Sequence, residues 1–233
     1  MKKYAHPATG YTAAVCLLLL VVATSIFVPT YFRPFFRWQF ERRGIPAQLN
    51  IEMDELMRAT DQLLDYMRGR EPSMEIAVTF ADGVERAFFT NEREIVHMVD
   101  VYYLYRGGRF IRNAAAVVLV AALGAFAFFK ISWRFLALGV IRVMAVFFGL
   151  LGLLVVLIAM DFGTAFTIFH NIFFSNDYWI LNPRESRLIV MLPQGFFVHI
   201  SIFMGAMMAM FSVVLVTAAA VYLRKTRPEE TPS

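Results

Sequence analysis

The sequence predicts a mainly α-helical integral membrane protein, with four transmembrane helices and a small α+β extracytoplasmic insertion between helices 1 and 2. Hydrophobic residues make up 59% of the 233 residues and charged residues 17%, whereas soluble domains contain nearer half and a quarter. The mean hydropathy is +0.59. Four stretches are long and apolar enough to cross a bilayer, which takes about 20 residues. They are residues 11–29, 113–129, 135–160 and 194–223.

The same composition excludes several other classes of protein. Low hydrophobicity and clustered charge are both absent, which argues against a disordered chain and against a nucleic-acid-binding one. The single cysteine, Cys16, excludes an intrachain disulfide framework and a zinc site built from cysteines.

The first span, 11–29, follows Lys2 and Lys3 and could be mistaken for a signal peptide. Its apolar core is longer than a usual signal core, and no clear Ala-x-Ala cleavage site follows it. We therefore expect a helix that is not cleaved.

The segment 30–112 is expected to form the insertion. Asn50 is predicted to cap a helix that ends near Arg68. Segments 75–80 and 84–90 flank Ala81-Asp82-Gly83, a pattern typical of a β-hairpin.

A second helix of the insertion is expected to run toward the second span. Asn91 followed by Glu94 resembles the start of a helix. The pair Gly107-Gly108 is predicted to loosen this helix just before the membrane.

The second outer loop, 161–193, is rich in aromatic residues. So many aromatic side chains outside a span indicate a segment that lies in the membrane interface or dips back into the protein.

The orientation follows from lysine and arginine in the short segments, which favour the cytoplasmic side. One side of a four-span protein collects all four lysines and several arginines, so we predict that both termini are cytoplasmic. These cations are Lys2, Lys3, Lys130, Arg134, Arg142, Arg224, Lys225 and Arg227. The two loops 30–112 and 161–193 are then extracytoplasmic.

His97 is the first candidate for proton chemistry. It stands three residues before Asp100, which would share its helix face and could fix its tautomer and orientation. Glu94 is a rival partner. The structural alternative is a partly buried histidine whose ring is satisfied by a backbone carbonyl.

His170 lies in a very apolar run. Burial there would lower the pKa of the imidazole and keep it neutral at pH 7, as a general base requires. The alternative is an interfacial ring that packs among phenylalanines. A zinc site made of His97, His170 and His199 is a further possibility, but the spacing matches no known ligand pattern.

Five short segments of the sequence resemble the lipoprotein intramolecular transacylase family of bacterial membrane proteins. The resemblance covers most of the chain. It rests on Glu94-Ile-Val-His97-Met98-Val99-Asp100-Val101, Phe166-Thr-Ile-Phe-His170-Asn171-Ile-Phe-Phe, Asn176-Asp177-Tyr178-Trp179, Leu188-Ile189 and Pro193-Gln194-Gly195-Phe196-Phe197.

The resemblance implies an acyltransferase acting on diacylglyceryl lipoproteins in the outer leaflet of the bacterial cell membrane. Such an enzyme moves the sn-2 acyl chain of the lipidated cysteine onto the α-amino group of that cysteine, giving a lyso-form lipoprotein. It needs no cofactor or metal. The resemblance makes His97 and His170 the catalytic pair. We predict His97 as the general base, supported by Asp100, and His170 as its partner, although the two roles could be exchanged.

The sequence departs from the family pattern at two places where substrate contacts are expected. Tyr102-Tyr103 stands where a basic residue often follows Asp-Val, and Ser186-Arg187 stands where an acid often precedes Leu-Ile. Two other functions remain open. One is a non-catalytic membrane protein that binds a lipid or a protein partner. The other is a metal-dependent lipid hydrolase that uses the three outer histidines.

Overall fold

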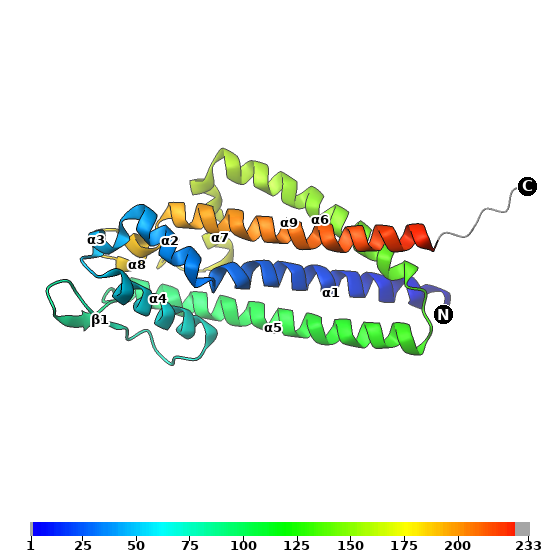
Figure 1. The fold of residues 1–233 in the computed structure, drawn as a ribbon, viewed down its shortest axis with the longest axis horizontal. Helices are drawn as coiled ribbons and strands as arrows, with labels where there is room; N and C mark the ends of the chain where they lie inside the picture. Colours follow the sequence, from blue (N-terminus) through cyan, green and yellow to red (C-terminus); the bar gives the residue numbers. More distant parts are fainter. Residues whose placement is uncertain (1, 227–233) are drawn as a thin grey trace, which may run out of the picture. The chain divides into compact units, whose positions relative to one another are not determined.

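The computed structural model describes residues 2–226, which form two compact units (Figure 1). The membrane unit consists of the described parts of 1–26, 109–159 and 204–233. The head unit consists of 27–108 and 160–203.

Four helices are long and apolar enough to span a membrane, as the sequence predicts. They are α1 (Lys2–Thr30), α5 (Glu92–Phe128), α6 (Arg134–Met160) and α9 (Gln194–Lys225). The prediction of a mainly helical membrane protein is therefore confirmed. The 37-residue α5 exceeds the length that a bilayer needs. Its apolar stretch begins at Asn113, and its N-terminal part carries charged residues.

Close contact between α1 and α6 organises the membrane unit. A Cβ added at Gly10 would lie 2.6 Å from the carbonyl oxygen of Phe135, and one added at Gly139 would lie 2.9 Å from the carbonyl oxygen of Gly10. Both glycines therefore let the two backbones touch, as small residues commonly do between membrane helices. Ala14, Met144 and Ala219 pack beside this contact in one buried cluster.

The head unit begins with three helices, α2 (Arg33–Arg43), α3 (Ile45–Leu49) and α4 (Met53–Arg68). The prediction that Asn50 caps the helix ending at Arg68 is wrong. Asn50 instead ends α3 in the left-handed conformation (φ 53°, ψ 49°), which asparagine tolerates better than most residues. The helix α4 starts at Met53 after Glu52.

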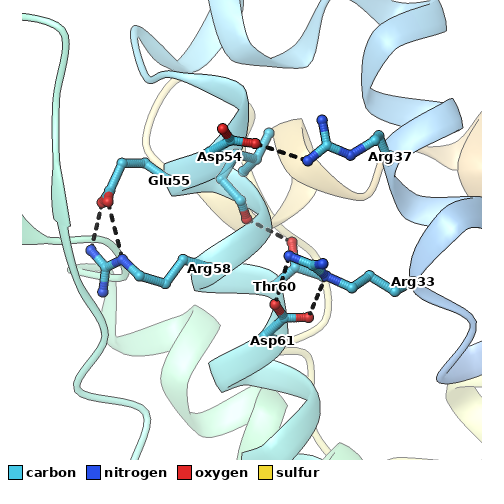
Figure 2. Close-up of polar contacts among 8 residues, drawn as sticks. Arg33, Arg37, Asp54, Glu55, Arg58, Thr60 and Asp61 are labelled. Carbon is cyan, nitrogen blue, oxygen red and sulfur yellow. Dashed lines mark hydrogen bonds and ion pairs between the residues drawn. The ribbon is translucent and has the colours of Figure 1, made fainter.

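Ion pairs join α2 to α4 on their exposed faces (Figure 2). The guanidinium of Arg33 lies 3.1 Å from a carboxylate oxygen of Asp61, and that of Arg37 lies 2.8 Å from Asp54. Such exposed pairs add little stability. The apolar faces of the two helices, which include buried Phe36, Phe40 and Leu56, provide the larger contribution.

The predicted hairpin is present. Strands β1 (Ala77–Thr79) and β2 (Glu85–Ala87) pair antiparallel, with Val78 opposite Arg86. Gly83 has a φ of 77°, which glycine adopts at no steric cost.

The prediction that Gly107-Gly108 loosens α5 is wrong, because the helix continues through both residues. Gly108 has a packing role instead. A Cβ there would lie 3.3 Å from Cζ of Phe27, so the absence of a side chain makes room for that ring.

The second loop contains two helices, α7 (Phe162–Phe173) and α8 (Arg187–Met191). The carboxylate of Asp161 caps α7 by accepting a hydrogen bond from the amide of Thr164. The hydroxyl of Ser186 caps α8 in the same way. The aromatic-rich run is therefore helical, and it brings His170 to the last turn of α7.

Candidate functional site

The structure brings His97 and His170 together within the head unit. His97 lies in the second turn of α5 and His170 in the last turn of α7. Their ring centroids are 5.9 Å apart, with an interplanar angle of 37°. Both side chains are buried. Two residues 73 positions apart in sequence thus form one imidazole pair.

The tautomer of His170 follows from its hydrogen bond. Its Nδ1 lies 2.7 Å from the carbonyl oxygen of Phe166. Because a carbonyl oxygen can only accept, Nδ1 carries the hydrogen, and Nε2 of the neutral ring keeps a lone pair. The indole of Trp179 stacks on the same ring, with centroids 4.6 Å apart and planes 29° apart.

His97 has an unsatisfied nitrogen. Its Nδ1 is buried and has no hydrogen-bond partner among residues 2–226. Phe174 contacts the edge of the ring, at a centroid distance of 5.2 Å. A buried polar atom without a partner is costly, and such atoms in a native site often await a ligand or a water molecule.

Burial keeps both imidazoles neutral at pH 7. It lowers the pKa of His97 to about 4, a shift to which the neighbouring His170 adds and which the carboxylate of Asp100 opposes. Burial also lowers the pKa of His170, and the hydrogen bond to Phe166 opposes that shift. A neutral ring can accept a proton, so both residues suit a base at physiological pH.

The hydrogen bond that the structure gives Asp100 is with Asn176 rather than with His97. The side-chain amide of Asn176 donates to Oδ2 of Asp100 over 2.8 Å. The main-chain oxygen of Asn176 accepts a hydrogen bond from the indole of Trp179 over 3.1 Å. Asp100 is thereby connected to the indole that lies on His170.

The rival partner, Glu94, also has another role. Its side chain is 1% exposed. One carboxylate oxygen accepts a hydrogen bond from the amide of Leu188, at 2.8 Å. Glu94 therefore attaches the start of α8 to the first turn of α5.

Further contacts fix the loop after α7 and the start of α8 against the residues at and just before the start of α5. The guanidinium of Arg93 donates to the main-chain oxygen of Asp177 and lies 5.2 Å from the ring centroid of Tyr178. Arg187 donates to the carbonyl oxygen of Phe88 over 2.7 Å. Asn176 and Trp179 belong to one of the family-like segments, but the sequence predicts no role for either. Their polar and aromatic types in an apolar loop were the available signal.

The third outer histidine belongs to a different cluster. Nδ1 of His199 lies 2.9 Å from the amide nitrogen of Gln39 and 3.3 Å from the guanidinium of Arg43. The ring of Trp38 packs nearby, at a centroid distance of 5.5 Å. Within residues 2–226, no three His, Cys, Asp or Glu side chains gather closely enough to hold a metal ion.

A known protein family matches most of this chain. The sequence model of the family described as "Lipoprotein intramolecular transacylase Lit" matches residues 11–197, which include both helices of the histidine pair. The chain belongs to the lipoprotein intramolecular transacylase family.

Solved structures of this family have the same fold. The in meso structure of the membrane-integral lipoprotein intramolecular transacylase from Bacillus cereus is 20% identical. It matches with a TM-score of 0.81 over 97% of this chain and 99% of that chain.

Two variants of the Bacillus cereus protein also match, one with a histidine replaced by alanine and one with it replaced by arginine. The alanine variant is 20% identical, with a TM-score of 0.74 over 97% of each chain. The arginine variant is 19% identical, with a TM-score of 0.71 over 97% of this chain and 95% of that chain. No curated protein sequence matches significantly. The chain is therefore a multi-pass membrane protein of a transacylase family.

Proposed function

We propose that this protein transfers the sn-2 acyl chain of a diacylglyceryl-cysteine to the α-amino group of the same cysteine. The observation that carries the proposal is the buried pair His97 and His170, in which His170 has a lone pair at Nε2 and His97 has an unpartnered Nδ1. The family supplies the reaction class. A substrate that contains both donor and acceptor needs only proximity and proton transfer.

The chemistry requires one proton to move from the amine to the departing oxygen. The α-amine, with a pKa near 8, attacks the ester in its neutral form. The new C–N bond forms at the carbonyl carbon, the nitrogen loses a proton to a base, and the C–O bond to the glyceryl carbon 2 oxygen breaks. That oxygen takes up a proton as it leaves, so the histidines end the cycle as they began it.

The contacts favour His170 as the base. The sequence suggests His97 in that role, so the two histidines exchange roles in this proposal. The carbonyl of Phe166 and the face of Trp179 both stabilise an imidazolium at His170. His97 then donates a hydrogen bond to the ester oxygen as negative charge develops there. Burial opposes a positive charge more strongly at His97, whose pKa is about 4.

Asp100 supports the site as a positioning residue in this proposal. It holds Asn176, and Asn176 holds the indole of Trp179 that lies on His170. The carboxylate also acts on His97 through its charge, which raises the pKa of that imidazole.

The proposal places the head unit on the extracytoplasmic face and both termini in the cytoplasm. The short-segment lysines and arginines support this orientation. Diacylglyceryl lipoproteins of the outer leaflet would then be the partners. A reporter fused after Ser233 that is active only outside the cell would contradict it.

The test is mass spectrometry of lipoprotein N-termini from cells with and without this protein. We expect N-acyl, mono-O-acyl cysteine only when the protein is present. A His97→Ala, His170→Ala double variant that accumulates in the membrane to the same level serves as the control. Unchanged N-termini, together with retention of diacylglyceryl lipopeptide by the purified protein, would favour a non-catalytic binding protein instead.

A further inference from the structure

A charged side chain lies within a predicted membrane span, away from the histidine pair. Arg142 is in the third turn of α6, within the span Arg134–Gly152. Its guanidinium donates a hydrogen bond to the hydroxyl of Tyr11 on α1 over 2.6 Å. Charged residues inside membrane spans are costly and usually have a partner of opposite charge or a polar one.

The described part of the membrane unit offers Arg142 no acidic partner. The sequences 1–26, 109–159 and 204–226 contain neither aspartate nor glutamate. The phenol hydroxyl is neutral, so it satisfies one N–H of the guanidinium without balancing the charge. A counter-charge for Arg142 within this unit has to come from outside the described residues.

A groove starts at this arginine. It has a volume of about 480 Å³ and is lined by Tyr11 and Leu18 of α1 and by Arg142, Val143, Val146, Phe147 and Leu150 of α6. Apart from the Arg142–Tyr11 pair, the lining is aliphatic or aromatic. The α6 positions run over about 12 Å of helix, at 1.5 Å per residue.

We propose that this groove binds one anionic phospholipid, with a phosphate oxygen at Arg142 and an acyl chain along the apolar wall. Arginine is well suited to phosphate because its planar fork presents several donors in a fixed geometry. Tyr11 accepts from Arg142, so its own hydroxyl hydrogen can be donated to a second phosphate oxygen. The apolar lining suits a hydrocarbon chain and offers little to a water-soluble anion.

The proposal is independent of the transacylase reaction. The groove belongs to the membrane unit, whereas His97 and His170 belong to the head unit. The ligand is a resident lipid, with no acyl donor or acceptor role. A basic site between membrane helices on the cytoplasmic side is a known kind of headgroup site, and the predicted topology puts Arg142 on that side.

Native mass spectrometry of the purified protein tests the proposal. The protein is exchanged into mixed micelles containing equal amounts of phosphatidylglycerol and phosphatidylcholine with identical chains. We expect the wild type to retain one phosphatidylglycerol, and Arg142→Gln to retain about fivefold less. Arg134→Gln is the matched control, because Arg134 is also a cation of α6 but donates to Thr226. It should retain the lipid as the wild type does.

Two further variants keep the test decisive if Arg142→Gln does not accumulate. Arg142→Lys keeps the charge and should keep most of the lipid, whereas Val146→Trp fills the groove and should lose it. Any of three results would overturn the proposal. These are equal retention of phosphatidylcholine by the wild type, equal loss in Arg134→Gln, and undiminished retention in Val146→Trp. Each readout is bound lipid, so an inactive transacylase leaves the test unaffected.

Discussion

The head unit contains two histidine clusters that differ in what their ring nitrogens contact. At the first, His170 donates through Nδ1 and keeps Nε2 unprotonated, and His97 has a buried Nδ1 without a partner among the described residues. At the second, Nδ1 of His199 lies within hydrogen-bond distance of the side-chain amide of Gln39 and of the guanidinium of Arg43. The first cluster pairs two imidazoles with each other, whereas at the second a single imidazole holds α2 against the start of α9.

A histidine near the outer face therefore does not by itself define a site. His199 resembles the other two in sequence terms, since all three are predicted to lie near the outer face. The difference lies in its neighbours, because an adjacent guanidinium disfavours an imidazolium and a carbonyl oxygen favours one.

Loss of lyso-lipoprotein formation in alanine variants should differ strongly between the two histidine clusters. His97→Ala and His170→Ala should each reduce lyso-lipoprotein formation by about a thousandfold, since each removes a group that moves or stabilises a proton. His199→Ala should reduce it by less than about tenfold, through packing alone. Turnover of a diacylglyceryl lipopeptide, normalised to folded protein, measures this. Equal losses in all three variants, restored by added zinc, would instead support the metal-dependent reading.

The pH dependence of turnover should follow the substrate amine. Burial lowers the pKa of His97 to about 4 and also lowers that of His170, so both rings are already neutral at pH 7. The rate should therefore rise between pH 6 and 8, by about tenfold per unit below the amine pKa. It should level off once the amine is deprotonated.

The control is the α-amine of the lipopeptide substrate, titrated by NMR in the same detergent micelles as the turnover assay. Its midpoint should coincide with that of the rate profile. A profile whose midpoint shifts with substitutions around His170, while the amine titration stays fixed, would show that a histidine controls the rate and that its ring is not held neutral.

A smaller effect should distinguish the two roles of Asp100. Asp100→Ala removes the acceptor for Asn176 and should lower turnover by about fivefold to tenfold. Asp100→Asn keeps an acceptor oxygen, so turnover should stay within about twofold of wild type. The NMR shift of the His170 ring should move in Asp100→Ala and in Trp179→Leu. If Asp100→Asn were as damaging as Asp100→Ala, the main role of Asp100 would be the effect of its negative charge on His97.

A still smaller effect concerns the hydrogen bond between Glu94 and Leu188, which attaches α8 to α5 beside the histidine pair. Glu94→Ala leaves the buried amide of Leu188 without its acceptor and should destabilise the protein by about 1 to 3 kcal/mol. Glu94→Gln retains an acceptor oxygen and should be close to wild type. Glu92→Ala removes an exposed acid from the same helical turn and is the matched control. Thermal unfolding in detergent compares the three, and equal melting temperatures would contradict this role.

Much of the fold was predictable because apolar length alone defines membrane spans. The four spans and the Asp82-Gly83 hairpin depend on local sequence, and all are present. Asn50 and Gly107-Gly108 were misread because the local preference of each residue fits two structures. Asparagine can cap either end of a helix, and a glycine within a helix can serve close packing as well as flexibility.

The site was predictable only in part, because its contacts span long separations in sequence. The resemblance paired His97 with His170, and the structure brings them together. The link from Asp100 to Asn176 crosses 76 positions and that from Glu94 to Leu188 crosses 94. Helix periodicity relates a residue only to neighbours three or four positions away, so it suggested a His97–Asp100 pair and missed both links.

A crossover experiment tests the central claim, that the histidine pair catalyses transfer within one substrate molecule. Purified protein receives two diacylglyceryl lipopeptides together, one with heavy acyl chains on a light peptide and one with light acyl chains on a heavy peptide. We predict N-acyl, mono-O-acyl products in which every acyl chain stays on its original peptide, and no product with His97→Ala or His170→Ala. Products that combine a heavy chain with a heavy peptide, or an acylated serine or threonine on the enzyme, would contradict direct intramolecular transfer.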